Sequence, residues 1–470
     1  LVFLFGKVLF SQQDSAVCKI RLSKTINGYQ PVLVPVVNLW SDALYFDRQE
    51  HPENTGGFMD KDEIWVSTKQ EGEWTEPIRL AEPVNSRYND ALFSISPDEQ
   101  TALAYGTFTE ERGADPGYAL LKNVFGKWVY DRHLNIKNYY NQSELFYGYL
   151  AHDGKTLMLS AVRYNSLGSH DLYVSFFDEK DSVWSEPKNL SSDVNTKGTE
   201  ASPFLAYDGK TLYFASDGYD GQGKLDLYMA RRLDNSWEKW SKPVNLGEKI
   251  NSGQDDKSIY LTALGDSAFV VSYDTSTKRP GIYKICIPEN LRPAPYSVLH
   301  GTVKARRKGK AFTLHENVKV VSGNKFDMTD RENGRYVIIK NEDPDDTQVD
   351  VESERYDSVE TIVRNNPSNF KSPEFVNIDL VVSESEEPLQ DTLITIYFEF
   401  NSSELTENAR QQLNISKIKA ENIQITGHTD TVGTDSYNMQ LSKRRAESAG
   451  KFLVKQGFSR EKIEIVPKGE

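Results

Sequence analysis

The chain has 470 residues, more than one hydrophobic core usually serves, so its length alone predicts about three domains. Its formal net charge is -14, which argues against a surface for nucleic acid or an anionic membrane, since both require clustered positive charge. Aromatic residues make up 11% of the chain and Gly–Asp turns are frequent, a composition typical of β-rich proteins.

The first ten residues, LVFLFGKVLF, form an apolar run without an initiator Met. We interpret residues 1–15 as the remnant of an export signal with a short tail, and an ordinary first β-strand is the alternative. No other stretch approaches the ~18 apolar residues of a membrane span. Cys18 is a poor lipid-attachment site because the preceding Ser15-Ala16-Val17 lacks the usual apolar-then-small pattern, and lipid anchoring of the intact protein stays an open question.

A unit of about 55 residues recurs five times between residues 26 and 288. In each copy an Asp-containing tight turn precedes an alternating apolar strand, as in a β-hairpin, and a second strand follows. These turns contain Asp42, Asp98, Asp153, Asp208 and Asp266. Stretches such as WTEPIRLAEPVNS and WSKPVNLGEKINS separate the copies, and the one at Trp128 is degenerate. Repeats built only of strands favour a five-bladed β-propeller over a solenoid, the alternative.

The elements D-G-x-x-L-Y-F and D-L-Y resemble the PD40 (WD40-like, TolB-like) propeller repeats, and we assign residues 16–288 to this domain. A closed propeller brings its two ends together, so the only two cysteines, Cys18 and Cys286, can form a disulfide. Two free buried thiols are the alternative, and the distance between the Cα atoms decides between them. No CxxC pair or zinc-type His/Cys spacing occurs, so we expect no metal site and no cofactor.

A proline-punctuated linker, residues 289–298, leads into short alternating strands over residues 299–382. Their GTV, D-x-x-G-R-Y and ESERYDS elements resemble the carboxypeptidase regulatory-like (transthyretin-like) β-sandwich. In that family the module is usually a spacer or an adhesion unit. The acidic run at residues 343–346, DPDD, is interpreted as a solvated loop and not as a calcium site.

A polar linker, residues 383–390, precedes alternating strands and helices over residues 391–470, a pattern that predicts a small α/β layer. The helix that begins near Ser436 has a stripe of side chains at helical spacing. The stripe contains Asn438, Leu441, Ser442, Arg445, Ala449 and Phe452, whereas Lys443 and Arg444 point away from it. An arginine on a face that should be buried requires a partner.

Three elements of this module, F-x-F-N-S-S-x-L, G-H-T-D-T-x-G and N-x-x-L-S-x-x-R-A, resemble the OmpA-like (OmpA/MotB/Pal) peptidoglycan-binding domain. The resemblance implies that Asp430 and Arg445 hold diaminopimelate of the peptidoglycan stem peptide. This chemistry is reasonable, because a guanidinium grips a carboxylate with two charge-assisted hydrogen bonds and a carboxylate accepts from an ammonium. The alternative is a structural ion pair between Arg445 and Asp430.

Four more residues are candidates for the same site. Asn438 and Leu441 share the face of Arg445 and are expected to shape the pocket, and Thr429 and Asn401 are weaker candidates. We expect His428 to be a packed or hydrogen-bonded loop residue and not a catalyst. The chain stops at VPKGE, before the N-R-R-V-E-like strand typical of the family, so the module is interpreted as C-terminally truncated.

The sequence therefore predicts a multidomain, mainly β, non-enzymatic scaffold in the periplasm, associated with the outer membrane and the cell wall of a Gram-negative-type envelope. Its expected partners are peptidoglycan and unidentified envelope proteins that bind the propeller. The order of the modules resembles an envelope component of the type IX secretion and gliding machinery. The alternative is a propeller enzyme that processes glycans or peptides, which would need paired carboxylates in the central channel.

Overall fold

The computed structural model describes residues 18–28, 31–59, 62–86, 88–108, 116–307, 310–314, 317–323, 325–341, 349–353, 356–363, 373–384, 394–399, 402–413, 423–429 and 435–469. The chain divides into two compact units, Leu1–Ser385 and Glu386–Glu470, and this boundary falls within the predicted linker at residues 383–390. The predicted export segment, residues 1–15, and the DPDD run, residues 343–346, lie outside the described residues.

The first unit is mainly β, as predicted, and begins with five antiparallel sheets whose strands follow the order of the chain. Sheet one contains β2 (Val32–Val37), β3 (Ala43–Arg48), β4 (Glu63–Gln70), β5 (Glu73–Trp74) and β6 (Ile78–Arg79). Sheet two contains β7 (Ala91–Ile95), β8 (Thr101–Gly106), β9 (Gly117–Val124) and β10 (Lys127–His133). Sheet three contains β11 (Tyr147–Leu150), β12 (Thr156–Ala161), β13 (Asp171–Asp178), β14 (Val183–Trp184) and β15 (Lys188–Asn189). Sheet four contains β16 (Glu200–Leu205), β17 (Thr211–Ser216), β18 (Asp226–Arg231) and β19 (Val244–Asn245), and sheet five contains β20 (Asp256–Leu261), β21 (Ser267–Asp274) and β22 (Arg279–Cys286).

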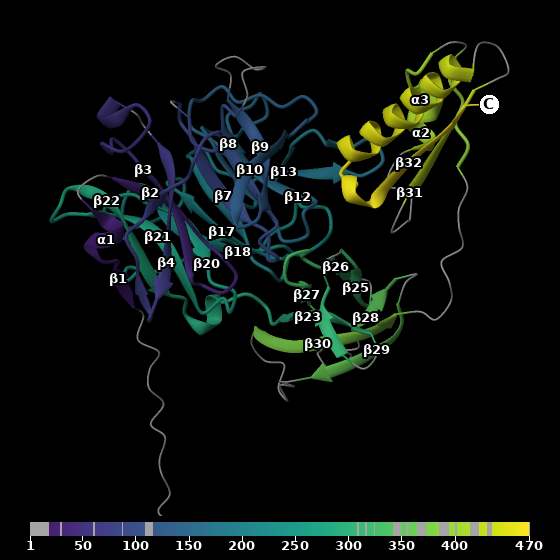
Figure 1. Cartoon of the computed structure of the whole chain (residues 1–470). Coiled ribbons are helices and arrows are strands. Elements are labelled where there is room, and N and C mark those ends of the chain that lie inside the picture. The colour runs from purple at the N-terminus through teal and green to yellow at the C-terminus, as the bar shows by residue number, and fades with distance from the viewer. Residues whose placement is uncertain are drawn as a thin grey trace, which may run out of the picture. The chain divides into compact units, whose positions relative to one another are not determined.

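The first strands of these sheets, β2, β7, β11, β16 and β20, contact one another in cyclic order, and β20 contacts β2. Three of them, β2, β7 and β20, are labelled in Figure 1. Sheet five is completed by β1 (Lys19–Arg21), which pairs antiparallel with β22. The two ends of the repeat region therefore meet in one sheet. At this joint Cys18 and Cys286 form a disulfide with a Cα–Cα distance of 5.1 Å, and Lys19 Nζ lies 2.9 Å from Asp256 Oδ1.

The recurring aspartates lie in the hairpin turns between the first and second strands of the sheets. In sheet three the Asp153 carboxylate accepts from the backbone N–H groups of Lys155 and Thr156, both at 2.9 Å. Asp208 makes the same contacts in sheet four. Such Asx-type contacts satisfy the backbone of a tight turn, which explains why aspartate recurs at this position.

A buried asparagine joins each of four sheets to the chain that follows its outer strand. Asn195 is representative: its Oδ1 accepts from Leu172 N at 2.7 Å, and its Nδ2 donates to Leu172 O at 3.0 Å. The side-chain amide thus replaces a neighbouring strand beside β13. Asn27, Asn85 and Asn251 make the equivalent pair of bonds in the other sheets. Our sequence analysis did not single out these residues, although each ends a recurring VN or IN dipeptide.

The segment predicted as a linker, residues 289–298, is packed against the five sheets. Leu291 at the end of η3 (Glu289–Leu291) is buried, and so is Tyr296, whose hydroxyl donates to Ala263 O at 2.5 Å. Ala294 N donates to Asp208 Oδ2 at 2.9 Å. The prolines interrupt regular structure here, but burial and hydrogen bonds hold the segment in place.

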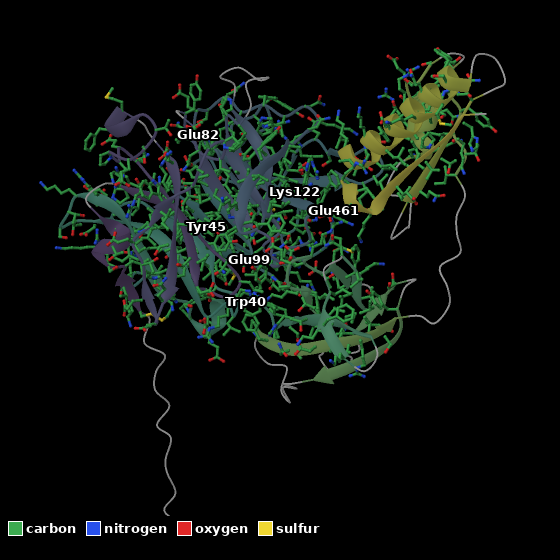
Figure 2. All side chains as sticks on the ribbon, in the orientation of Figure 1. Trp40, Tyr45, Glu82, Glu99, Lys122 and Glu461 are labelled. Carbon is green, nitrogen blue, oxygen red and sulfur yellow. A yellow bond between two sulfur atoms is a disulfide. The ribbon has the colours of Figure 1, made fainter. Side chains whose placement is uncertain are left out.

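A second group of strands completes the first unit. One sheet contains β23 (Ser297–Arg307), β24 (Lys310–Thr313), β27 (Arg335–Lys340), β29 (Tyr356–Val363) and β30 (Glu374–Glu384), and the other contains β25 (Lys319–Ser322), β26 (Lys325–Met328) and β28 (Asp350–Glu352). The pair β23 and β30 is parallel, and a separate hydrophobic core includes Leu299, Tyr336 and Ile378. Trp40, labelled in Figure 2, stacks on Phe375 of this group with ring centroids 5.4 Å apart.

The second unit is a small α/β layer in its described residues, as predicted. The parallel strands β31 (Ile423–His428) and β32 (Ile463–Gly469) are joined through α3 (Asp435–Lys455) and the short η6 (Arg460–Lys462). Thr406 is the N-cap of the helix α2 (Glu407–Gln412), and its hydroxyl accepts from Ala409 N at 3.1 Å. Leu413, Ala449, Leu453 and Ile463 form the core of the layer.

Candidate functional site

The buried face of α3 carries the residues that helical spacing predicts. Asn438, Leu441 and Ser442 are buried, with 1%, 6% and 0% exposure, and Ala449 and the half-buried Phe452 continue the same face. Lys443 and Arg444 are exposed on the other side of the helix. Arg445 is half-buried among the buried positions. The sequence therefore located the helix face correctly, including the position of its arginine.

The guanidinium of Arg445 is held by three main-chain carbonyls from three separate positions in the chain. Nε donates to Ser402 O at 2.8 Å, Nη1 to His428 O at 3.1 Å, and Nη2 to Glu399 O at 3.2 Å. Its Cζ lies 5.3 Å from the centroid of the Phe398 ring. Arg445 therefore connects α3 to the end of β31 and to the segment before α2, and its orientation is fixed.

These contacts use three of the five N–H donors that a guanidinium carries, so within the described residues two donors are left for other partners. The accepting carbonyls are neutral, so they do not cancel the positive charge. An arginine oriented in this way favours a negatively charged oxygen acceptor. Both alternatives from the sequence, a ligand carboxylate and the Asp430 side chain, meet this requirement.

The structure does not locate every predicted site residue. Asp430 and Asn401 lie outside the described residues. Thr429 lies at the end of β31, where its N–H and its hydroxyl both donate to Gly469 O, at 2.6 and 3.0 Å. This residue joins the ends of the two strands. His428 has an exposed side chain, and its carbonyl is the group that contacts Arg445.

Several residues that orient Arg445 escaped the sequence analysis. Phe398, Glu399 and Ser402 belong to the F-x-F-N-S-S-x-L element, from which only Asn401 was chosen as a candidate. Glu399 and Ser402 contact Arg445 through their main-chain carbonyls. Every residue has such a carbonyl, so the residue types at these positions could not predict the contacts. The ring of Phe398 could have indicated a contact with Arg445, since aromatic rings commonly lie beside arginine.

Gly427 of the G-H-T-D element allows α3 to approach β31 closely. A Cβ atom at this position would lie 2.1 Å from the main-chain oxygen of Ser442. We expect Gly427→Ala to destabilise the second unit by about 2 kcal/mol or more, because the backbone of α3 must move to accommodate the methyl group. Thermal unfolding of the full chain followed by circular dichroism measures the effect.

Gly450 provides the matched control, because it lies within α3 and a Cβ there has its nearest neighbour, Ile465 Cδ1, at 3.4 Å. We expect Gly450→Ala to be neutral or to stabilise by up to about 1 kcal/mol, as alanine favours a helix interior over glycine. Equal melting temperatures for the two variants would contradict the close-approach argument.

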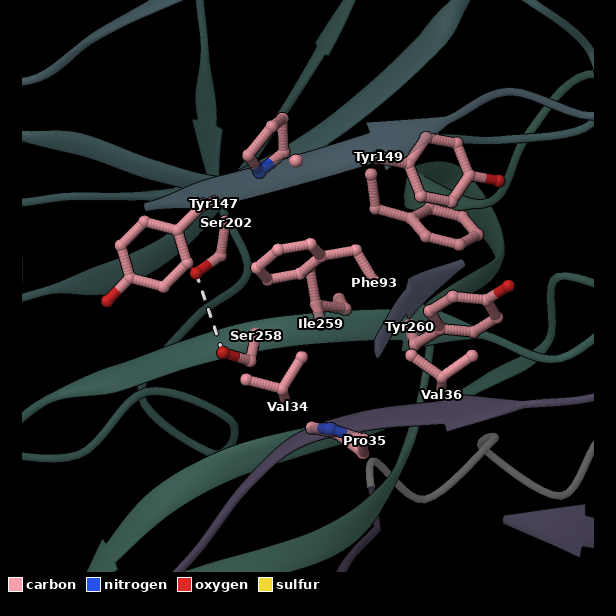
Figure 3. A pocket seen from close by; sticks show the side chains of 13 residues that line it. Val34, Pro35, Val36, Phe93, Tyr147, Tyr149, Ser202, Ser258, Ile259 and Tyr260 are labelled. Carbon is pink, nitrogen blue, oxygen red and sulfur yellow. Dashed lines mark hydrogen bonds between the residues drawn. The ribbon is translucent and has the colours of Figure 1, made fainter. Parts of the chain in front are cut away.

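A small pocket lies where the first strands of the five sheets meet (Figure 3). Its volume is about 30 Å³ and its lining includes Val36, Phe93, Tyr149, Phe204 and Tyr260. Burial raises the pKa of the Tyr149 and Tyr260 hydroxyls, so both stay neutral at physiological pH. The polar side chains of the lining are the hydroxyls of Tyr147, Tyr149, Tyr260, Ser202 and Ser258, and the last two lie 3.5 Å apart.

Comparison with known proteins identifies the class of the second unit. Residues 397–470 match the model of the OmpA family, so the C-terminal module is an OmpA family domain. Within the described residues, no helix is both long and apolar enough to cross a membrane.

Individual relatives match the same part of the chain. A peptidoglycan-associated lipoprotein of Pseudomonas putida is 38% identical over 90 residues, which cover 18% of this chain and 54% of the relative. The Pseudomonas aeruginosa protein of the same name is 37% identical with the same coverage, so the chain spans about half the length of these curated relatives. Outer membrane protein 40 of Porphyromonas gingivalis is 35% identical over 99 residues, 18% of this chain and 26% of that protein.

Among solved structures, a protein of unknown function from Dyadobacter fermentans aligns with 68% of this chain and 97% of its own. The sequence identity is 12% and the TM-score is 0.36.

Proposed function

We propose that the chain is a non-catalytic scaffold of the cell envelope that binds peptidoglycan through its second unit. The observation that carries the proposal is the orientation of Arg445 by three main-chain carbonyls within an OmpA family domain, with two of its N–H donors left among the described residues. Relatives of this domain are named peptidoglycan-associated lipoproteins. This relationship supports peptidoglycan binding and an envelope location.

The proposed ligand is diaminopimelate of the stem peptide. Its terminal amino acid group carries a carboxylate and an ammonium on one carbon, and Arg445 and Asp430 bind these two charges. A guanidinium that is already oriented loses little conformational freedom on binding, so more of the interaction energy contributes to affinity. The neighbouring Asn438 and Leu441 shape the face around Arg445.

We also propose that the five sheets of the first unit are the blades of a PD40-like β-propeller that binds a protein partner. The cyclic contacts of the first strands and the completion of sheet five by β1 support this architecture. In η1 (Gly57–Met59) the side chains of Phe58 and Met59 are 64% and 91% exposed, as at a surface that binds protein. We further propose that the strands after residue 296 form a carboxypeptidase regulatory-like β-sandwich.

The central pocket bears on the catalytic alternative. A glycosidase needs two carboxyl groups about 5–10 Å apart across its substrate. The lining of the pocket described above is aliphatic, aromatic and hydroxyl-bearing, so this pocket gives the glycosidase alternative no pair of carboxyl groups. The proposal includes a place in the type IX secretion machinery, in the periplasm beside the outer membrane. The ground for this part of the proposal is the order of the modules along the chain.

Two kinds of sacculi test the proposed ligand. We expect the purified chain to pellet with sacculi whose stem peptides contain diaminopimelate, and to remain in the supernatant with sacculi that contain lysine at that position. Lysine lacks the second carboxylate, so the Arg445 contact is lost. Densitometry of the pellet and supernatant fractions measures binding, and equal pelleting with both kinds of sacculi would refute the diaminopimelate assignment.

A further inference from the structure

The loop between β10 and β11, residues 134–146, departs from the repeat pattern of the first unit. In sheets one, three and four the outer strands are two residues long, whereas β10 pairs with β9 from Lys127 to His133. The degenerate signature that begins at Trp128 in β10 continues into this loop, whose sequence LNIKNYYNQSELF contains three aromatic residues. In repeat proteins, such repeat-specific changes are often found on the binding face.

One side of this loop is packed and the other is exposed. Leu134, Ile136, Tyr139 and Phe146 pack against a hydrophobic core that includes Tyr118 and Trp184. Tyr140 and Leu145 are 37% and 57% exposed. In the neighbouring loop between β12 and β13, Tyr164 and Leu167 are 75% and 50% exposed. We refer to Tyr140, Leu145, Tyr164 and Leu167 as the aromatic surface.

The buried side chain of Arg163 holds the two loops together. It is 4% exposed, and its Nη1 donates to Asn138 O at 3.0 Å and to Tyr140 O at 3.4 Å. Its guanidinium lies 4.6 Å from the Tyr140 ring centroid, and the Tyr140 hydroxyl accepts from Tyr164 N at 2.7 Å. One face of the Tyr140 ring is thus supported by Arg163, and the ring is oriented before any ligand binds.

A second set of bonds connects the same loops through Asn141. Its Oδ1 accepts from Val162 N at 2.9 Å, its Nδ2 donates to Leu145 O at 2.7 Å, and Gln142 N donates to Val162 O at 3.0 Å. These contacts fix the loops independently of the exposed side chains. The aromatic surface is therefore rigid, which lowers the entropy lost on binding.

The charges of the two loops indicate an uncharged ligand. Their exposed charged residues are Lys137 and Glu144, one of each sign, although the chain as a whole has a net charge of -14. A polyanion gains nothing from such a surface, whereas the apolar C–H face of a sugar ring packs on an exposed aromatic ring. The exposed hydroxyl and amide groups of Tyr164 and Gln142 can hydrogen-bond to a sugar.

We propose that the aromatic surface binds the glycan strand of the cell wall, as a second contact besides the stem-peptide site. The choice of this glycan rests on the proposed function, because a chain attached to peptidoglycan through its second unit meets the same polymer at a high effective concentration. Weak binding at the aromatic surface then raises the overall avidity for the wall.

A soluble tetramer of β-1,4-linked N-acetylglucosamine tests the proposal, because it has the sugar backbone but no stem peptide. We expect the full chain to bind it in isothermal titration calorimetry, and Tyr164→Ala and Tyr140→Ala to weaken binding about tenfold. Tyr164 is the more exposed of the two tyrosines, so its truncation leaves the fold intact. The control is Phe125→Ala, which removes an 80% exposed ring from the β9–β10 hairpin and should bind like the wild type.

Two outcomes would overturn the glycan assignment: no binding of the tetramer by the wild type at millimolar concentration, or equal binding by Tyr164→Ala. Arg445-dependent pelleting with sacculi would be unaffected by that result, so failure here is distinguishable from failure of the stem-peptide site.

Discussion

Arg445→Ala is expected to weaken binding to diaminopimelate-containing sacculi by at least about 30-fold, which corresponds to about 2 kcal/mol. The substitution removes the oriented guanidinium and leaves the ligand carboxylate without its charged donor. Arg445→Lys should lose most of the binding too, because an ammonium cannot contact three carbonyls and hold a carboxylate with two parallel bonds. Binding isotherms from pelleting at increasing amounts of sacculi measure both effects.

Arg444 is the matched control for this experiment, because it lies next to Arg445 in α3 but has an exposed side chain. Arg444→Ala removes the same charge and should bind as the wild type does. Asp430→Asn tests the proposed partner of the ligand ammonium and should weaken binding as well. Unchanged pelleting by a folded Arg445→Ala variant would contradict the site assignment. Because Arg445 also connects three parts of the unit, the folding of the variant is checked by circular dichroism.

The variant Cys18→Ser/Cys286→Ser is expected to lose about 3–5 kcal/mol of unfolding free energy in the first unit. The disulfide joins cysteines 268 residues apart in sequence, so it restricts the unfolded chain strongly. It also holds β1 in sheet five, where Cys286 N donates to Cys18 O at 3.0 Å. A loss of this size corresponds to a decrease of roughly 10 °C in melting temperature, measured by scanning calorimetry.

A reducing agent supplies the control for the disulfide. It should lower the melting temperature of the wild type to that of the double-serine variant and leave the variant unchanged. If wild type and variant unfold at the same temperature under oxidising conditions, the ion pair of Lys19 with Asp256 and the β1–β22 pairing suffice to hold the joint, and the disulfide contributes little.

The helix α3 in the second unit shows what sequence periodicity can predict. Because residues three and four apart share a helix face, the spacing alone placed Asn438, Leu441 and Ser442 on the buried side and Arg444 on the exposed side. The family resemblance on the three motifs agrees with the match of residues 397–470 to the OmpA family. In the first unit, the recurring aspartates correctly indicated the hairpin turns of the sheets.

Contacts between distant segments were less accessible from the sequence. The roles of Asn27, Asn85, Asn195 and Asn251 depend on main-chain groups of residues that are between 21 and 255 positions away. The packing of the linker at residues 289–298 likewise depends on Asp208 and Ala263, which no local pattern connects to it. Composition predicted a linker over residues 289–298, but it did not show that this segment packs or that β23 begins within it at Ser297.

The sequence by itself determined the periodic features of this protein: the repeats of about 55 residues, the buried stripe of one helix and the motifs of its C-terminal family domain. Only the tertiary structure decided what Arg445 and Arg163 contact. The physical reason is that their acceptors are main-chain carbonyls, which are the same in every residue and become specific only when folding brings them to one place.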